Sequence, residues 1–351
     1  MRTEIKTLLT PIFNETWEKA LVDVRERTPE GSVVNAWWPP GHFIKAIAHR
    51  RVVFDGATIN FPQAYWVANV FLSDNETDAL GMLRMLDVSG NDAAQYLKEL
   101  GVPLSTAVPL LKEIAPLDKT RAEIFLSTLL KNTDQRDHLL TLTHGQPPPA
   151  YLFLYNEFVE TNLQLAFFGK WNFKRIEEIN KDPSLLSQVP PHNSPEYVQY
   201  LWQMVGGPYR FSGVLNQLGR IGDNVFFDEN IRVDLRSKSC LIDSKKYGRG
   251  IPQSIFYLEE GTNDFTERRF EGNDLNFSVA LIKEEDHYSI ILMDRPLATS
   301  LLVRLYYFDG AGLKHIKPFN QEADLTKRTV IKIFEVDWEG FEKDVQEGKR
   351  N

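Results

Sequence analysis

Apolar residues recur at helical spacing in two early segments of the chain. Residues 14–27, NETWEKALVDVRER, carry apolar side chains on one helical face with charged residues between them, and TPEG then ends the segment. Residues 77–86, TDALGMLRML, place leucines on one face, and the preceding SDNE fits a capping box of Ser73 and Glu76. Further helical segments are predicted over 91–145, after which HGQPPPAYLFLY starts a buried strand.

A strand, helix, strand unit is predicted between the two early helical segments. SVVNAW at residues 32–37 is a short β-rich run, HFIKAIAH at 42–49 has a helical pattern, and RVVFD at 51–55 is a second β-rich run. The sequence WWPPG joins the first run to the helix. Loops at the carboxyl ends of strands in such units often bind ligands, so WWPPG is the first candidate for a functional site.

The pattern changes to alternating apolar and polar positions in the last third of the chain. SIFYLEE, NFSVALIKEE, YSIILMD and RTVIKIFEVDW predict strands. Residues 300–316, SLLVRLYYFDGAGLKHI, are interpreted as strands too, with a turn at Asp309 and Gly310. We therefore predict a mixed α/β core domain, mainly helical with a small sheet, over residues 1–231, followed by a β-rich antiparallel domain over 232–351.

Composition and charge narrow the class of protein. The chain has 351 residues, more than one hydrophobic core usually supports, and 42% of them are hydrophobic. Its net charge of -8 argues against a nucleic-acid partner, which requires a basic face. No apolar run approaches the roughly 18 residues of a membrane span, so the chain as given is predicted to be soluble, although a fragment of a longer membrane protein would begin in the same way.

The sequence contains none of the common catalytic or nucleotide-binding signatures. Walker-type, GxSxG, HExxH and GxGxxG motifs are absent. The single cysteine, Cys240, can form no internal disulfide and excludes a zinc site built from cysteines. His42 and His49 are separated by seven residues, near two helical turns, but metal sites usually have tighter spacing and a carboxylate ligand, so no metal site is predicted.

The WWPPG sequence predicts a rigid aromatic corner. Consecutive strand residues point to opposite faces, so Trp37 and Trp38 cannot both enter one core unless the backbone turns. Pro39 and Pro40 stiffen that turn, and Gly41 restores freedom after it. A rigid aromatic ledge suits the binding of a peptide or a sugar, because little entropy is lost. The alternative is that both rings cap the sheet or pack beneath another domain.

These segments together resemble a known family. The order Trp-Trp, two residues, Gly, a helix and then FDGAT resembles the soluble domain of the catalytic subunit of oligosaccharyltransferase, especially bacterial and archaeal members. TWEKALVDVRERTPEGSVVNAWW, YWVANVFLSDNETDALGMLRML, HGQPPPAYLFLYNEF, FFGKWNF and SLLVRLYYFDGAGLKHI resemble further segments of the family. The resemblance extends from about residue 14 to 338.

The resemblance implies a membrane glycosyltransferase that transfers a lipid-pyrophosphate-linked oligosaccharide onto asparagine in an Asn-x-Ser/Thr sequon. This chain would be its extracytoplasmic domain, tethered by an upstream transmembrane part. That part would hold the lipid-linked donor and a divalent metal, Mn or Mg, so this chain alone is expected to contain no catalytic residue, cofactor or metal site and to be inactive. Its expected partner is the acceptor polypeptide.

The chain differs from the family at positions where family members bind the acceptor sequon. The family's Trp-Trp-Asp corner accepts a hydrogen bond from the sequon hydroxyl, but Pro39 stands at the Asp position and has no side-chain acceptor. A second family element, an Asp with a Lys four residues later, aligns with Glu157 and Thr161. Phe158 aligns with a methionine that some members place against the acceptor's threonine methyl group.

Two hypotheses follow from these matches and departures. In the first, Trp37, Trp38, Pro39 and Gly41 form one wall of an acceptor-peptide site, and Glu157 and Phe158 line the other. In the second, the chain is a non-catalytic binding or scaffold module of the same fold with a degenerate pocket. For residues 157 and 158 alone, the simpler alternative is an ordinary helix face.

Overall fold

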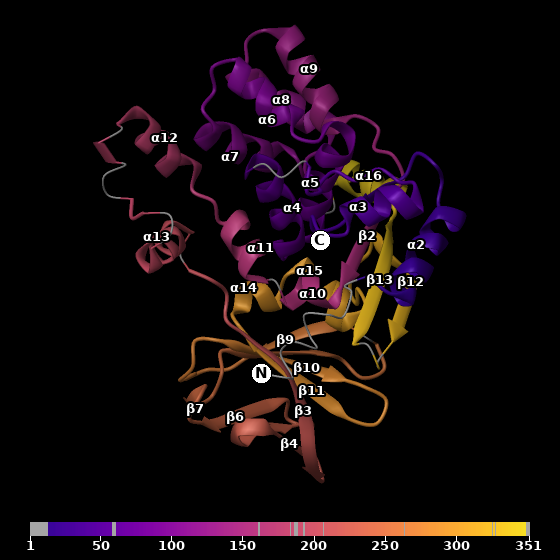
Figure 1. Ribbon diagram of the computed structural model, residues 1–351, viewed down its shortest axis with the longest axis vertical. Coiled ribbons are helices and arrows are strands. Elements are labelled where there is room, and N and C mark those ends of the chain that lie inside the picture. The colour runs from indigo at the N-terminus through magenta and orange to yellow at the C-terminus, as the bar shows by residue number, and fades with distance from the viewer. Residues whose placement is uncertain are drawn as a thin grey trace.

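The computed structural model describes most of the chain, namely residues 13–57, 61–160, 162–182, 184–185, 189–191, 194–205, 207–262, 264–324, 326 and 328–348. Within these residues the chain forms one sheet of four strands and one of nine. Helices surround the four-stranded sheet, and the nine-stranded sheet lies below them at the other end of the molecule (Figure 1). The predicted fold class, a mainly helical α/β core with a small sheet and a β-rich part, is confirmed.

The four-stranded sheet joins segments from both ends of the chain. Its order is β1 (Val33–Asn35), β2 (Ala150–Tyr155), β13 (Thr329–Val336) and β12 (Ile316–Asp324). β1 runs parallel to β2, and the other two pairs are antiparallel. All six residues of β2 are buried, because helices cover both of its faces, which explains its continuous apolar sequence AYLFLY.

The helices of the core come from three parts of the chain. They are α2 (Glu15–Arg27), α4 (Phe61–Leu72), α5 (Glu76–Ser89), α6 (Asp92–Glu99), α7 (Leu104–Ile114), α8 (Lys119–Leu129), α9 (Thr133–His144), α15 (Leu301–Phe308) and α16 (Trp338–Gln346). α2 packs on β12 and β13, while α15 packs on α4 and β2. Asn14 caps α2 by accepting hydrogen bonds from the backbone N–H groups of Thr16 and Trp17, as a side-chain oxygen at this position commonly does.

The predicted strand, helix, strand unit is only partly present. β1 forms, and the helix after WWPPG is α3 (Gly41–Phe43) continued by a π-helical turn, η1 (Ile44–Ala48). The expected strand at residues 51–55 is reduced to a single bridge between Arg51 and Val33. The chain therefore turns back beside β1 without forming a second long strand.

A short helical arm follows β2. It consists of α10 (Asn156–Glu160), α11 (Asn162–Gly169), α12 (Phe173–Lys181) and α13 (Pro195–Val205). α11 packs against α4, while α12 and α13 project to the side of the molecule (Figure 1). The arm then leads into the nine-stranded sheet.

The nine-stranded sheet has the order β7-β6-β5-β4-β3-β11-β10-β8-β9. Its strands are β3 (Phe211–Ile221), β4 (Asn224–Phe227), β5 (Ile231–Asp234), β6 (Ser239–Ser244), β7 (Gly248–Gly250), β8 (Ser254–Leu258), β9 (Phe265–Arg269), β10 (Ser278–Lys283) and β11 (Tyr288–Met293), with a 3-10 turn, η3 (Asp228–Asn230), before β5. Val225 and Ile242 from one half share a hydrophobic core with Ile255 and Ile290 from the other. The sheet therefore curls so that its two halves pack together.

Residues 300–316 differ from the sequence-based expectation. They contain the helix α15 and the loop before β12, not a strand pair, and α14 (Arg295–Ala298) precedes them. Ser300 caps α15, its hydroxyl oxygen accepting from Val303 N at 3.3 Å. A short, mostly apolar segment such as LLVRLYYF is compatible with a buried strand or a buried helix, and the cap favours the helix here.

The boundary predicted after residue 231 falls inside the nine-stranded sheet, because Ile231 is the first residue of β5. β12 and β13, assigned by sequence to the β-rich part, pair in the four-stranded sheet. Alternating apolar and polar residues predict a strand but not the strand it pairs with. The pairing of β12 and β13 in the four-stranded sheet therefore could not be predicted from the sequence.

Candidate functional site

Trp37 is a core residue. Its side chain is 0% exposed at the end of β1. The indole stacks on Phe158 at 6.2 Å between ring centroids with 4° between the planes, and Phe54 meets it edge-on at 5.1 Å. A ligand could reach this ring only after these neighbours moved.

Trp38 and Pro39 lie at the surface beside it. Both are half-buried, because the backbone turns immediately after Trp37. Gly41 N donates to Trp38 O at 3.2 Å and closes the turn, while Pro40, in the right-handed helical region, precedes the first residue of α3. The two tryptophans thus have different surroundings, with one ring supporting the core and the next forming a ledge.

Gly41 is required by a close approach of the chain to itself. A Cβ at this position would collide with Cβ of Asp55 and would lie 3.1 Å from its Cα. Our interpretation that Gly41 supplies backbone freedom is therefore replaced by a packing reason. Asp55 is 0% exposed, accepts from Ala57 N at 2.9 Å and pairs with Lys45, so it fixes the loop behind the corner.

The second predicted wall lies inside the protein. Phe158 on α10 is 0% exposed and contacts Phe71 edge-on at 4.8 Å as well as the Trp37 ring. Glu157 is half-buried, and together with burial its charge raises the pKa of Tyr155. Thr161 lies outside the described residues. Trp37 and Phe158, expected on opposite walls of an acceptor site, thus lie in the core as stacked rings.

Gln164 on α11 is the residue of the corner that sequence reasoning missed. Its Oε1 accepts hydrogen bonds from Trp37 Nε1 at 2.9 Å and from Trp38 Nε1 at 3.3 Å. The two rings are therefore tied to one amide more than 120 residues away in the chain. No local motif marks such a partner, because the contact depends on the packing of α11 against α4.

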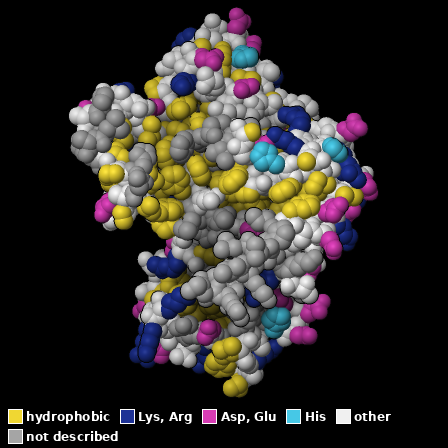
Figure 2. Space-filling model, viewed as in Figure 1, with side chains coloured by type: hydrophobic (Ala, Val, Ile, Leu, Met, Phe, Trp, Pro, Cys, Tyr) yellow, Lys and Arg dark blue, Asp and Glu magenta, His cyan; other side chains and the backbone are white. Residues whose placement is uncertain are grey.

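An apolar groove opens next to Gln164. Between α11 and α13 it has a volume of about 260 Å³ and is lined by Gln164, Phe167, Phe168, Val198, Leu201 and Trp202. Hydrophobic side chains gather between the helical arm and the core on this face (Figure 2). Val198 is 56% exposed, so the groove is an accessible apolar surface.

Comparisons with known proteins agree with the sequence resemblance. The chain matches no family model. The dolichyl-phosphooligosaccharide-protein glycotransferase of Methanococcus voltae is 36% identical over 95% of this chain and 38% of its own length. The protein of the same name from Methanocaldococcus jannaschii is 29% identical over 94% of this chain and 35% of its own.

This chain is homologous to the archaeal oligosaccharyltransferases. The family resemblance predicted from the sequence is confirmed, and the chain spans little more than a third of the length of these oligosaccharyltransferases. Among solved structures, the C-terminal domain of C. jejuni PglB aligns with 91% of this chain and 98% of its own, at 11% identity and a TM-score of 0.46.

The described residues form neither a metal-binding cluster nor a membrane-spanning helix. Among the described residues, no group of three or more His, Cys, Asp or Glu side chains is arranged to hold a metal ion. No helix in the described part of the chain has the length and apolar character needed to span a bilayer. His42 and His49 are both exposed on the short helical segment after the corner.

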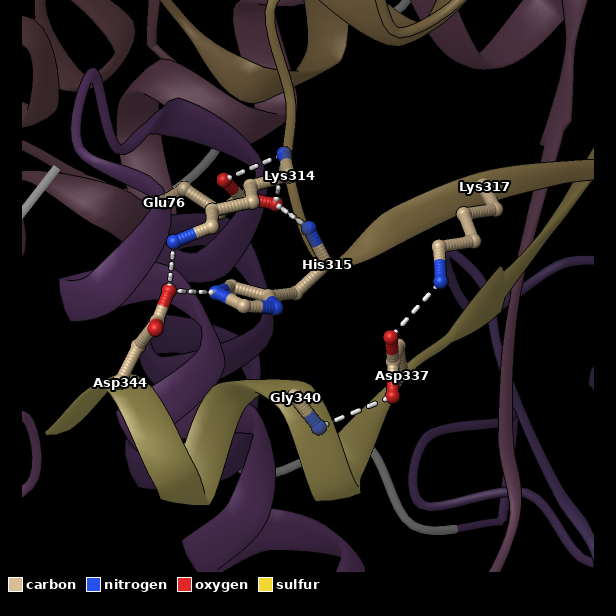
Figure 3. Close-up of polar contacts among 7 residues, drawn as sticks. All are labelled: Glu76, Lys314, His315, Lys317, Asp337, Gly340 and Asp344. Carbon is tan, nitrogen blue, oxygen red and sulfur yellow. Dashed lines mark hydrogen bonds and ion pairs between the residues drawn. The ribbon is translucent and has the colours of Figure 1, made fainter. Parts of the chain in front are cut away.

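A cluster of polar residues joins α5, the loop before β12 and α16 (Figure 3). Glu76 accepts from the backbone N–H of Lys314 at 2.9 Å and of His315 at 2.8 Å. Asp344 on α16 pairs with Lys314 and lies 3.1 Å from His315 Nε2. The carboxylate of Glu76, expected to cap α5, instead holds the loop before β12, and Asn75 caps the helix.

Proposed function

We propose that this chain is the acceptor-recognising, extracytoplasmic part of an oligosaccharyltransferase. The parent protein would transfer an oligosaccharide from a lipid carrier to asparagine in acceptor polypeptides. The observation that carries the proposal is homology over nearly the whole chain to proteins named as dolichyl-phosphooligosaccharide-protein glycotransferases. The WWPPG corner, with a half-buried tryptophan at the surface of a stiff turn, supports peptide binding as its part in the reaction.

In this proposal the remaining parts of the reaction lie elsewhere in the parent. The lipid-linked oligosaccharide, the membrane tether and a divalent metal, Mn or Mg, would belong to a part of the parent outside this chain, which spans 35% and 38% of the length of the two relatives. This chain would position the acceptor and supply no group to the chemical step.

In this proposal the residues of the WWPPG corner have different roles, either contacting the peptide or supporting the residues that do. Trp38 and Pro39 are the surface that a peptide would contact. Trp37, stacked on Phe158, backs that surface and keeps it rigid, and Gly41 with Asp55 fixes the loop behind it. Since Pro39 has no side-chain hydrogen-bond acceptor, its side chain would contribute apolar contact and would not bind the sequon hydroxyl.

The same proline supports a second candidate function, a non-catalytic binding or scaffold module. A carboxylate that accepts a hydrogen bond contributes on the order of 1.5 to 3 kcal/mol, so its absence could weaken sequon binding roughly tenfold to a hundredfold. Such a chain would keep the fold and bind a partner without selecting sequons.

Peptide titrations distinguish the two functions. Labelled peptides with Asn-x-Thr, Asn-x-Ala and Gln-x-Thr are titrated against the chain and its Pro39→Asp variant. For an acceptor site, we expect the native chain to bind peptides through Trp38, with weaker binding in Trp38→Ala, and only Pro39→Asp to prefer the Thr peptide by about tenfold. If Trp38→Ala changes nothing and neither protein shows a preference, the scaffold function is favoured.

A further inference from the structure

The bonds at Gln164 fix the orientation of its amide. Trp37 Nε1 and Trp38 Nε1 can only donate, and both lie within hydrogen-bond distance of the same atom, at 2.9 Å and 3.3 Å. That atom must be the acceptor oxygen, because the amide nitrogen there would face two donors. The two N–H groups of Nε2 are consequently directed away from the indoles.

Those N–H groups belong to an exposed side chain that contacts Trp38 and also lines the apolar groove. Gln164 is exposed on α11, with the Trp38 ledge on one side and the apolar groove on the other. The remaining described residues that line the groove are apolar or aromatic: Phe167, Phe168, Val198, Leu201 and Trp202. An exposed apolar groove with one oriented donor at its edge is a pattern typical of ligand sites.

We propose that Gln164 is a peptide-binding residue of the corner, donating from Nε2 to a backbone carbonyl oxygen of an extended peptide whose neighbouring apolar side chain enters the groove. The inference rests on the proposed function and deepens it, because it names a polar group that contacts the peptide where Pro39 has no side-chain acceptor. Nε2 can only donate, so it binds an acceptor oxygen of the peptide and cannot accept a hydroxyl proton.

The chemistry of the groove favours a peptide over other ligands. A sugar needs several polar partners, and a phosphate needs cations or clustered N–H donors. Gln164 is the single polar residue among the described residues of the lining, and no lysine or arginine is among them. The volume of about 260 Å³ suits a bulky side chain and is small for a drug-sized ligand.

The test compares two substitutions at Gln164. Gln164→Glu keeps acceptor oxygens for both indoles, so the corner stays intact, but it replaces the donor with a charge that repels a carbonyl. Gln164→Leu removes the hydrogen bond and keeps the bulk. Fluorescence anisotropy with a labelled Asn-x-Thr peptide carrying leucine flanks measures binding, and a serine-flanked peptide is the matched probe for the groove.

We expect both variants to weaken binding of the leucine-flanked peptide by about threefold to tenfold, the range for one lost hydrogen bond. Gln95→Leu, a substitution of an exposed glutamine on α6 whose side chain donates to Glu99, should bind like the native chain. The serine-flanked peptide should bind more weakly, and Trp202→Ser should remove that difference.

Three results would overturn the inference. Native affinity in both Gln164 variants, with weaker binding in Trp38→Ala, would reject Gln164 and leave the proposed function intact. Native affinity in the Gln164 variants and in Trp38→Ala alike would reject the proposed function as well. Stoichiometric displacement of the peptide by a short polyprenyl phosphate would identify the groove as a lipid site.

Discussion

Asn35 Nδ2 lies 2.9 Å from Oδ1 and 3.2 Å from Oδ2 of Asp87, so the amide that ends β1 holds a carboxyl group of α5 that is 1% exposed. Burial raises the pKa of Asp87 to about 8, and the Asn35 bond and the charge of Arg51 oppose that rise only in part. The pair lies directly behind the residues that lead into the WWPPG corner.

The raised pKa makes stability depend on pH. An unfolded aspartate titrates near ~3.9, so between about pH 4 and pH 8 the folded protein binds more protons than the unfolded chain, and stability falls as pH rises. Burial and the charge of Arg84 lower the pKa of His144 to about 3, which gives the opposite slope below about pH 6.5. The effect of Asp87 is therefore best separated above pH ~6.5.

Asp87→Asn should remove this slope, because an amide keeps an acceptor for Asn35 and has no proton to lose. We expect the native chain to lose up to about 1.4 kcal/mol per pH unit between roughly pH 6.5 and 8 relative to the variant. Urea unfolding at several pH values measures the difference. Asp137→Asn, at an exposed position, serves as the control, and parallel curves for native chain and Asp87→Asn would contradict the prediction.

Gly81 lies where α5 meets the end of α7, and we expect Gly81→Ala to destabilise the fold. A Cβ there would overlap the carbonyl oxygen of Ala115 and lie 2.7 Å from Pro116 N. In an exposed helix the same change stabilises by up to about 1 kcal/mol, but overpacking against backbone costs about 1 to 3 kcal/mol, so the contact decides the sign. Thermal unfolding measures it.

Gly31→Ala is the matched control for this substitution, since no heavy atom lies within 4 Å of an added Cβ at that site. It should leave the melting temperature nearly unchanged. A Gly81→Ala variant as stable as Gly31→Ala would contradict the prediction. It would mean that α5 and the end of α7 can move apart without a loss of stability.

The elements that could be predicted are those whose own sequence decides their conformation. Alternation over a short segment predicted β10 and β13, and the continuous apolar run of β2 marked a strand buried on both faces. The strand prediction for the residues of α15 was wrong because their mostly apolar sequence suits either a strand or a helix. The contact that favours the helix, the Ser300 cap, is a single hydrogen bond.

Long-range pairing explains what the sequence did not reveal. β13 pairs with β2 through Ile331 and Tyr155, residues far apart in the chain, and alternation carries no information about that partner. The same holds at the corner, where Gln164 reaches both indoles across the fold. The adjacent tryptophans and the two prolines indicated a stiff turn at the corner, whereas the burial of the Trp37 ring depends on its contact with Phe158.

Trp37 and Trp38 should therefore respond differently to the same substitution. Trp37→Ala removes a fully buried ring from contacts with Phe54 and Phe158 and should cost about 3 to 5 kcal/mol of the free energy of unfolding. Trp38→Ala removes a half-buried ring and should cost less than about 2 kcal/mol, since part of its surface is already in water. Urea unfolding of both variants measures the two costs.

The contrast tests the division of the corner into a core ring and a surface ledge. Trp37→Phe keeps an aromatic ring against Phe158 but loses the bond to Gln164, so it should recover most of the stability lost in Trp37→Ala. Equal costs for Trp37→Ala and Trp38→Ala would mean that both rings support the fold alike. In that case weaker peptide binding by Trp38→Ala could reflect a disturbed fold, and only the Gln164→Glu variant, which keeps acceptors for both indoles, would still report on recognition.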